Sequence, residues 1–286
     1  MGSVEKEVFK TLAYSDYFNY PLTFTQMWQY LISDKIIEKK DIIDTLKKSK
    51  VIGKKNIYFF LKGKIAIVDK RIEREKISLK KLLLAKHFAK ILSLVPTVIF
   101  VGISGSLAMK NAAENDDIDF FIISSPGTIW ITRIICVLIL FLFGVKRKRI
   151  GENHRNKICL NMYLDGSQMA LPLKDHNLYT AHEVVQVMPV VNKNNIHELF
   201  LKENAWVLKY MPNSIHPKVL RSINFANSSF AFLFPFETFS KRLQLWYMKK
   251  HLTSETVSDT YIAFHPKDVT EKILNAYANK YKSYNI

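Results

Sequence analysis

Cysteine, glycine and proline are scarce in this chain of 286 residues. The 2 cysteines, Cys136 and Cys159, are too few for a disulfide framework or for a zinc site of several thiolates. Both lie in apolar runs, where a cysteine is usually a small buried residue of a protein kept in reducing conditions. With 9 glycines, 9 prolines and 48% hydrophobic residues, the composition predicts a folded globular protein rather than a disordered one.

The chain also has little that resembles a membrane-spanning or targeting segment. The candidate span, Ile134 to Val145, has 12 uncharged residues and is followed by four basic ones, whereas a membrane span needs about 20 apolar residues. We expect this segment to be a helix packed against a sheet, and we do not expect a membrane partner. The first residues lack the basic-then-apolar pattern of a signal peptide, which together with the cysteine usage predicts a cytoplasmic protein.

Acidic residues are outnumbered, with 25 Asp and Glu against 42 Lys and Arg, and the net charge is +17. Residues 1–95 hold 20 of the basic residues and only 10 acidic ones. Such a field attracts polyanions and favours nucleic acid as a partner. Two other interpretations stay open: the charge serves only solubility or the attraction of a nucleotide, or it faces an acidic membrane surface.

Residues 1–63 show the outline of a winged helix. Three short helices are expected, the third from Lys40 to Lys50, followed by two apolar strands that flank a turn at residues 53–56. The basic residues of the third helix and the turn are Lys47, Lys48, Lys54 and Lys55. They suit a nucleic-acid reader, but an interaction or dimerisation domain explains the outline equally well. Residues 64–96 are expected to form a connecting helix that ends at Pro96.

A short apolar run, residues 97–103, follows Pro96 and predicts a buried strand. It leads into Ser104-Gly105-Ser106 and then into residues that favour a helix. A strand, a turn of small residues and a helix N-terminus present backbone N–H groups to phosphate oxygens, and Gly105 lets the backbone approach closely. By itself this pattern is weak, because a Gly-Ser turn after a strand is usually only a turn.

Asp117 and Asp119 lead directly into the next strand. Their spacing of two residues places both carboxylates on the same face of the strand. Two carboxylates so close repel each other unless a cation lies between them, and Mg²⁺ prefers oxygen ligands. The alternative interpretation is a solvated strand entry with a charged edge.

Residues 97–165 together resemble the signature of the DNA polymerase β nucleotidyltransferase superfamily: strand, Gly105-Ser106, helix, then Asp117-Ile118-Asp119 at the start of a strand. The resemblance implies an α+β fold with a mixed sheet and flanking helices, an NTP bound by Gly105 and Ser106, and Mg²⁺ or Mn²⁺ ions on the aspartates. It also implies transfer of an NMP to an acceptor with release of pyrophosphate. The likeness extends to bacterial nucleotidyltransferase-domain proteins at residues 101–108, 157–165 and 178–186, which says little about the acceptor.

The third carboxylate of that family lies on a later strand. Here the strand is expected at residues 158–165, where alternation places Cys159, Asn161, Tyr163 and Asp165 on one face. Asp165 is therefore the expected third catalytic and metal-binding carboxylate, with Asn161 as the other polar candidate. An ordinary turn aspartate is the alternative for Asp165. If neither residue has this role, nucleotide binding can persist without turnover.

The nucleotidyltransferase core is expected to span residues 97–190, and residues 191–286 are expected to be helical. Thr180 and Glu183 form a capping-box pattern, so a helix is expected to begin there with His182 exposed. Further helices are expected at about 196–211, 216–231, 236–251 and 268–281. The aromatic residues Trp206, Trp246 and Tyr247 are expected in the core, and His251 and His265 lack partners at the spacing of zinc ligands.

Three functions follow from these patterns. The first is a metal-dependent nucleotidyltransferase that acts on nucleic acid or protein and carries a basic winged-helix-like appendage. The second is a nucleic-acid-binding regulator whose transferase core is silent. The third is a small-molecule nucleotidyltransferase, for which so basic an N-terminal third has no evident use.

Overall fold

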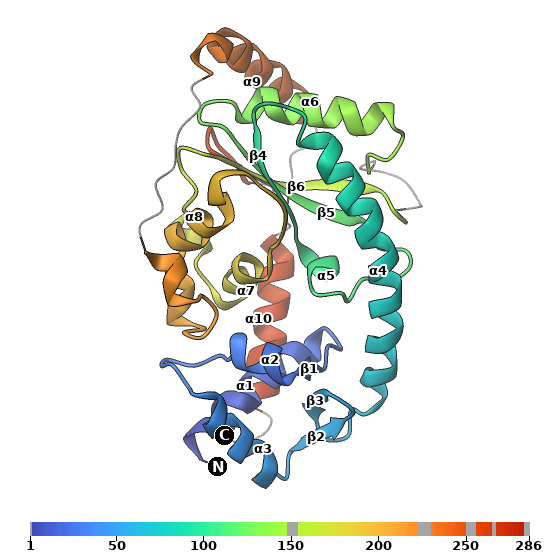
Figure 1. Cartoon of the computed structure of the whole chain (residues 1–286), viewed down its shortest axis with the longest axis vertical. Coiled ribbons are helices and arrows are strands. Elements are labelled where there is room, and N and C mark those ends of the chain that lie inside the picture. The colour runs from blue at the N-terminus through green and yellow to red at the C-terminus, as the bar shows by residue number, and fades with distance from the viewer. Residues whose placement is uncertain (1, 148–153, 222–229, 250–255, 265–266, 283–286) are drawn as a thin grey trace.

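Three helices and a small sheet form the N-terminal end of the molecule in the computed structural model (Figure 1). The structure describes residues 2–147, 154–221, 230–249, 256–264 and 267–282. The N-terminal elements are α1 (Ser3–Tyr17), β1 (Leu22–Thr23), α2 (Phe24–Gln29), α3 (Lys39–Lys48), β2 (Ile52–Lys55) and β3 (Tyr58–Leu61). The strands pair antiparallel in the order β1-β3-β2. The expected helices and hairpin are thus present, and their assignment to the winged-helix fold stays a prediction.

Local chemistry explains where these elements begin and turn. The Thr23 hydroxyl accepts the backbone N–H of Gln26 at 3.3 Å, and the Gln26 side chain accepts the N–H of Thr23 at 3.1 Å, so the two residues cap α2 reciprocally. The expected turn at residues 53–56 is wrong in detail. Gly53 pairs with Phe60 inside the sheet, and the chain reverses at Asn56, whose φ of 56° suits asparagine.

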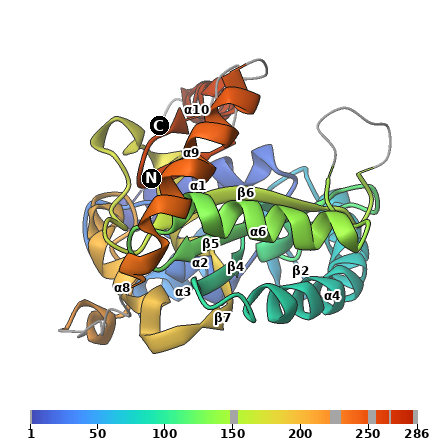
Figure 2. The same cartoon turned by 90° about the horizontal axis from the view of Figure 1, so that it is seen from above.

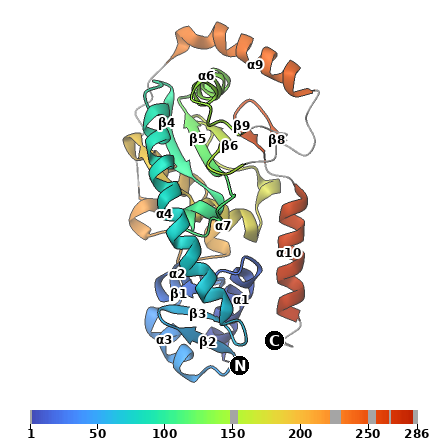
Figure 3. The same ribbon diagram turned by 90° about the vertical axis from the view of Figure 1, so that its right-hand side faces the viewer.

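One long helix, α4 (Ala66–Leu92), connects the N-terminal region to the rest of the chain, as expected (Figures 1 and 3). Two of its basic side chains are buried. The Arg71 guanidinium donates to the backbone oxygen of Met109 at 2.7 Å, and Lys81 donates to the backbone oxygens of Glu114 and Asp116 at 3.0 and 2.7 Å. Because buried cations need such partners, these bonds fix the loop before the second core strand against α4.

The core of the molecule is a six-stranded mixed sheet in the order β7-β4-β5-β6-β9-β8. The strands are β4 (Val98–Ile103), β5 (Ile118–Ser124), β6 (Ile158–Asp165), β7 (Met188–Asn192), β8 (Thr256–Val257) and β9 (Tyr261–Ala263). β5 and β6 run parallel and are joined by α6 (Ile129–Leu142), while the other neighbours are antiparallel. This arrangement confirms an α+β fold with a mixed sheet and flanking helices. Its assignment to the polymerase β type stays a prediction.

Helices cover both faces of this sheet. α4, α6 and α9 (Phe234–Lys249) share one apolar cluster with it, and α6 and α9 lie side by side (Figure 2). α7 (Leu178–Gln186) and α8 (Ile196–Glu203) share the cluster on the opposite face. α10 (Lys267–Lys282) packs on α1 and α7 and so joins the N-terminal region to the core (Figure 3).

The C-terminal region differs from the expected all-helical arrangement. β8 and β9 add strands to the sheet, and β7 extends two residues past the expected core boundary at 190. In place of the expected helix at 216–231, the described residues contain a short 3-10 helix, Pro217–Leu220, and the start of another at Ala231. Residues 222–229, His251 and His265 lie outside the described residues. Trp206 is partly buried, but Trp246 and Tyr247 are 65% and 63% exposed. The expectation for these two residues was wrong, because α9 turns its other face, including Gln244 and Met248, toward the core.

No helix in the described part of the chain is long and apolar enough to cross a membrane. The candidate segment forms most of α6, whose buried residues include Trp130, Cys136 and Leu140. Burial explains only part of the apolar composition of the segment, because Leu138, Phe141, Leu142 and Phe143 are exposed.

Candidate functional site

The turn after β4 brings the first pair of expected site residues together. β4 is buried along its whole length and ends at Ile103. Gly105 then takes a φ of +63°, and a β-carbon on it would lie 2.8 Å from Oδ2 of Asp119. A larger residue is excluded here by both backbone conformation and space. Within the described residues, no side chain caps the one-turn helix α5 (Gly105–Ala108), and the buried Oγ of Ser104 has no hydrogen-bond partner.

Ser106, the second expected nucleotide-binding residue, already has a partner. Its hydroxyl donates to Oδ2 of Asp116 at 3.2 Å, and the same oxygen accepts the backbone N–H of Ala113 at 2.8 Å. The ammonium group of Lys81 donates to the backbone oxygen of the same Asp116 at 2.7 Å. The sequence patterns did not single out Asp116 or Lys81, because their role depends on contacts between distant segments.

Asp117 and Asp119 lie together, as their spacing predicts, and a third side chain joins them. One ligand atom each from Asp117, Asp119 and Cys159 lie within 4.8 Å of one another. Cys159 comes from β6 and is the direct strand partner of Asp119. The sequence patterns missed it, because a cysteine in an apolar run is typical of a core position.

Asp165 does not reach this cluster, so its expected role as third ligand was wrong. It pairs with Ser124 at the far end of β5 and β6 and is only 1% exposed. Its carboxylate accepts the backbone N–H groups of Gly127 at 2.8 Å and Ser167 at 2.9 Å, and the hydroxyl of Ser167 at 2.6 Å. These bonds hold both the turn before α6, at Gly127, and the turn after β6, at Ser167. Asp165 is therefore a structural residue, as its position beside Gly166 also allowed.

Asn161, the other candidate for the third position, is buried within β6. Its backbone oxygen accepts the N–H of Phe264 at 3.0 Å, and the register between β5 and β6 shifts beside it, between Phe120 and Phe121. The strand residue directly opposite Asp119 is Cys159, two positions before Asn161.

A positive charge stands against the acidic pair. Nη1 of Arg147 lies 2.8 Å from Oδ2 of Asp117 and 3.6 Å from Sγ of Cys159. Arg147 follows α6, and its N–H donates to the backbone oxygen of Ile158 at 2.9 Å, which places it beside the start of β6. In the sequence it is only one of the four basic residues that follow the apolar segment 134–145.

The electrostatics of the cluster show that its charges are incompletely balanced. Burial, with the nearby charges of Asp117 and Glu183, raises the pKa of Asp119 to about 7, although Arg147 opposes the shift. Burial and the same aspartates raise the pKa of the Cys159 thiol to about 12. Cys159 is therefore a neutral thiol near neutral pH and does not replace a third carboxylate.

This donor set fits a hard divalent cation in part. Asp117 and Asp119 offer carboxylate oxygens, which Mg²⁺ and Mn²⁺ accept, while the protonated sulfur of Cys159 is a poor ligand for either. A cation held here therefore needs most of its remaining ligands from water or from a phosphate-bearing substrate. The uncapped turn at Gly105 lies directly beside Asp119 and is suited to such a substrate.

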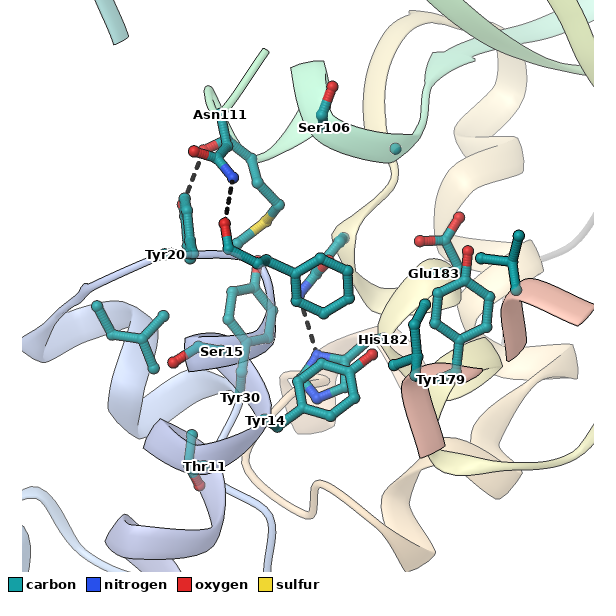
Figure 4. A pocket seen from close by; sticks show the side chains of 17 residues that line it. Thr11, Tyr14, Ser15, Tyr20, Tyr30, Ser106, Asn111, Tyr179, His182 and Glu183 are labelled. Atoms are coloured by element: carbon teal, nitrogen blue, oxygen red, sulfur yellow. Dashed lines mark hydrogen bonds between the residues drawn. The ribbon is translucent and has the colours of Figure 1, made fainter. Parts of the chain in front are cut away.

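The helix α7 contacts α5, the short helix that begins at Gly105. It begins at Leu178 rather than at Thr180, because the Asn177 side chain accepts the N–H of Thr180 at 3.0 Å. His182 was expected to be exposed, but it is buried at 4% exposure and stacks on Tyr14 of α1. Glu183 lines a cavity together with Gly105 and Ser106, and burial raises its pKa to about 7 (Figure 4).

Comparison with known proteins identifies no relative: no protein-family model, curated protein or solved structure matches the chain.

Proposed function

We propose that the protein is a metal-dependent nucleotidyltransferase, in which Gly105 and Ser106 hold a nucleoside triphosphate and Asp117 and Asp119 hold Mg²⁺ or Mn²⁺. The observation that carries this proposal is the contact between Gly105 and Asp119. A β-carbon at Gly105 would lie only 2.8 Å from Oδ2 of Asp119, so the candidate phosphate turn and the candidate metal carboxylate adjoin each other. Neighbouring sites for phosphate oxygens and their cation are what triphosphate chemistry requires.

In the proposed reaction, a hydroxyl of the acceptor attacks the α-phosphorus of the triphosphate. The new bond joins the acceptor oxygen to that phosphorus, the bond to the β-phosphate oxygen breaks, and pyrophosphate leaves. The cation, when bound, supplies positive charge to the phosphate oxygens. Uncapped N–H groups at the Gly105 turn and the Arg147 guanidinium add donors that can bind phosphate oxygens.

The proton of the acceptor hydroxyl needs a base, and Asp165 is too far along the strand to serve. Glu183 lines the cavity beside Gly105, and its charge helps to raise the pKa of Asp119. Burial raises the pKa of Glu183 itself to about 7, which suits proton transfer near neutral pH. We assign Glu183 the role of proton acceptor in this reaction.

A second candidate function is a silent nucleotide-binding module. Two observations favour it: a neutral Cys159 occupies the strand position opposite Asp119, and Arg147 already pairs with Asp117. In that case the site binds a nucleotide without turning it over, and the function of the protein depends on whether the nucleotide is bound. The same experiment separates the two candidates.

The test supplies each α-³²P-labelled NTP with Mg²⁺ or Mn²⁺ to the protein, together with RNA, DNA, cell-lysate protein and a small-molecule extract. We expect label transfer by the wild type and none by an Asp117→Asn/Asp119→Asn variant. The matched control, Asp41→Asn/Asp44→Asn, removes two exposed aspartates of α3 and should transfer label normally.

Label transfer that persists without Asp117 and Asp119 would overturn the proposed mechanism. Nucleotide binding without any transfer would favour the silent module. A Cys159→Asp variant then adds the missing carboxylate, and transfer by this variant but not by Cys159→Ser would identify Cys159 as the reason for the silence.

A further inference from the structure

A cavity of about 230 Å³ lies between the N-terminal region and the core. Its walls come from α1, from the Gly105 turn and α5, from α7 and from α10 (Figure 4). Gly105 and Ser106 form one end of it, so the cavity opens beside the candidate phosphate turn. The N-terminal region therefore contributes to the candidate site directly.

Aromatic rings form much of the cavity wall. Tyr14 and His182 stack with ring centroids 4.1 Å apart and planes 8° apart, and Tyr30 lies 6.1 Å from the same imidazole. Tyr179 and Phe18 add further rings. Tyr14 and His182 cover one face of each other and are 5% and 4% exposed, so a flat ligand can stack only on the parts of the rings that remain open to the cavity.

The cavity wall lacks the cationic side chains that a phosphate group would need. The described residues that line the cavity include no lysine or arginine, although the chain carries a net charge of +17. Its one carboxyl group is that of Glu183. An uncharged ring system suits this environment, whereas the phosphates suit the turn and the cation site next to it.

One hydrogen-bonding group of the described wall residues, Nε2 of His182, is unused. The side-chain nitrogen of Gln186 lies 3.0 Å from Nδ1 of His182, and because an amide nitrogen can only donate, Nδ1 accepts. Burial lowers the pKa of His182 to about 3, so the ring is neutral and carries its proton on Nε2. That buried nitrogen has no partner among the described residues. A neutral donor is complementary to a carbonyl oxygen or a ring nitrogen of a ligand. Because Nε2 is fully buried, a ligand reaches it only when the side chains around it shift.

We propose that this cavity binds the nucleobase of the triphosphate, with His182, Tyr14 of α1 and Tyr179 as its recognition surface. The inference rests on the proposed function, because the cavity shares Gly105 and Ser106 with the phosphate site. It gives the N-terminal region a role in nucleotide selection that is independent of nucleic-acid binding.

Titration calorimetry with non-hydrolysable NTP analogues, inorganic tripolyphosphate and free nucleosides, all with Mg²⁺, tests this assignment. We expect the wild type to bind at least one NTP analogue more tightly than tripolyphosphate. His182→Ala should weaken that analogue about ten-fold or more, as the loss of a stacking surface does, and leave tripolyphosphate within two-fold. His182→Phe keeps the ring but removes Nε2–H, and should change the order of preference among the bases.

The matched control is His176→Ala. The ring of His176 stacks on Trp206, with centroids 3.9 Å apart, and this residue does not line the cavity. The variant should leave every affinity unchanged. Equal binding of tripolyphosphate and all NTP analogues by the wild type would overturn the proposal. Unchanged nucleotide affinity in His182→Ala would also overturn it, and would leave the cavity to another ligand.

Binding at the phosphate site is tested by a separate variant. Asp119→Asn should weaken tripolyphosphate and NTP analogues alike. If the wild type binds nucleosides in a His182-dependent way but does not bind tripolyphosphate, the nucleobase site stands and the proposed function fails.

Discussion

The guanidinium of Arg147 lies 2.8 Å from the carboxylate of Asp117 and leaves Asp119 without a comparable partner in the described part of the chain. One cation thus partly balances two adjacent carboxylates and a nearby glutamate. Under the proposed function, a divalent ion at Asp117 and Asp119 would compete with Arg147 for Asp117. We therefore expect the ion pair to weaken metal binding in the absence of substrate.

Replacing Arg147 by glutamine should tighten the binding of Mn²⁺ alone. Removal of a competing, partly exposed ion pair is worth about 1 kcal/mol, or roughly a five-fold gain in affinity. The affinity for tripolyphosphate should fall, because a donor to phosphate is lost. Electron paramagnetic resonance of free Mn²⁺ measures the first effect and calorimetry the second. The control is Arg155→Gln, which removes an ion pair with Glu114 instead of Asp117. Equal changes in the Mn²⁺ affinity of both variants would show that Arg147 does not compete with the metal.

Gly105→Ala should destabilise the fold and abolish nucleotide binding. The new β-carbon would meet Oδ2 of Asp119 at 2.8 Å and the backbone would keep a φ of +63°. Together, overpacking and backbone strain should cost about 2–4 kcal/mol of the free energy of unfolding. The control is Gly127→Ala, where φ is +69° but no atom lies within 4 Å, so only about 1 kcal/mol of strain is expected. Urea denaturation compares the two, and equal losses would show that the contact with Asp119 is unimportant.

Asp119→Asn should stabilise the metal-free protein at alkaline pH. The pKa of Asp119 is raised to about 7 in the folded state by burial and neighbouring charge. A raised carboxyl pKa favours the folded state at low pH, and this stability is lost as pH rises from about 4 through 7. The variant lacks this loss, so it should match the wild type near pH 4 and exceed it near pH 8 by on the order of 1–3 kcal/mol.

Urea denaturation with EDTA across that pH range measures the difference. Added Mg²⁺ and an NTP analogue should stabilise the wild type and not the variant. If the free energies of unfolding of the two proteins changed with pH in the same way, ionisation of Asp119 would not destabilise the fold.

The sequence predicts the half of the candidate site that lies on contiguous segments. Gly105, Ser106, Asp117 and Asp119 are recognisable because a buried strand, a turn and a second strand succeed one another within a short stretch. The strand at residues 98–103 is recognisable for a related reason, since complete burial leaves an unbroken apolar run.

The other half depends on contacts that no local pattern encodes. Alternation predicts one face for Cys159, Tyr163 and Asp165, and this is wrong, because the register shift at Asn161 interrupts it. Before the shift Ile158 and Leu160 belong to one apolar cluster, and after it Met162 and Leu164 belong to the cluster on the opposite face. Asp165 is therefore separated from Cys159 both by this change of face and by six residues, about 20 Å of strand. His182 was misjudged because a helix start is usually exposed, and here Tyr14 of α1 covers it. The side chain of Arg147 stays partly exposed, and its contact with Asp117 could not be predicted because it joins two segments that are distant in the sequence.

Asp165→Ala should damage folding rather than nucleotide binding. The buried carboxylate accepts hydrogen bonds from Gly127, Ser167 and Thr128, and its removal leaves these donors unsatisfied. We expect a loss of about 2–4 kcal/mol in the free energy of unfolding, and unchanged affinity for Mg²⁺ and NTP analogues in the folded fraction. Asp119→Asn is the opposite case, with binding lost and the fold retained. A selective loss of metal affinity in Asp165→Ala would restore it as a ligand.

The basic side chains of α3 and the β2–β3 turn give the last prediction. Lys47, Lys48 and Lys54 are exposed, while Lys55 pairs with Asp69 at 2.7 Å. If this surface binds polynucleotides, changing these four lysines to Glu should weaken binding and flatten its dependence on salt, because fewer counterions are released.

The control reverses the same charge elsewhere, at the exposed Lys76, Lys80, Lys86 and Lys90 of α4. Both variants have the same net charge, so only a localised binding surface distinguishes them. Fluorescence anisotropy with labelled RNA and DNA at several salt concentrations measures the slope for each. Equal slopes would mean that the net charge of +17 acts as a diffuse field, and that the N-terminal region serves the nucleotide cavity rather than nucleic acid.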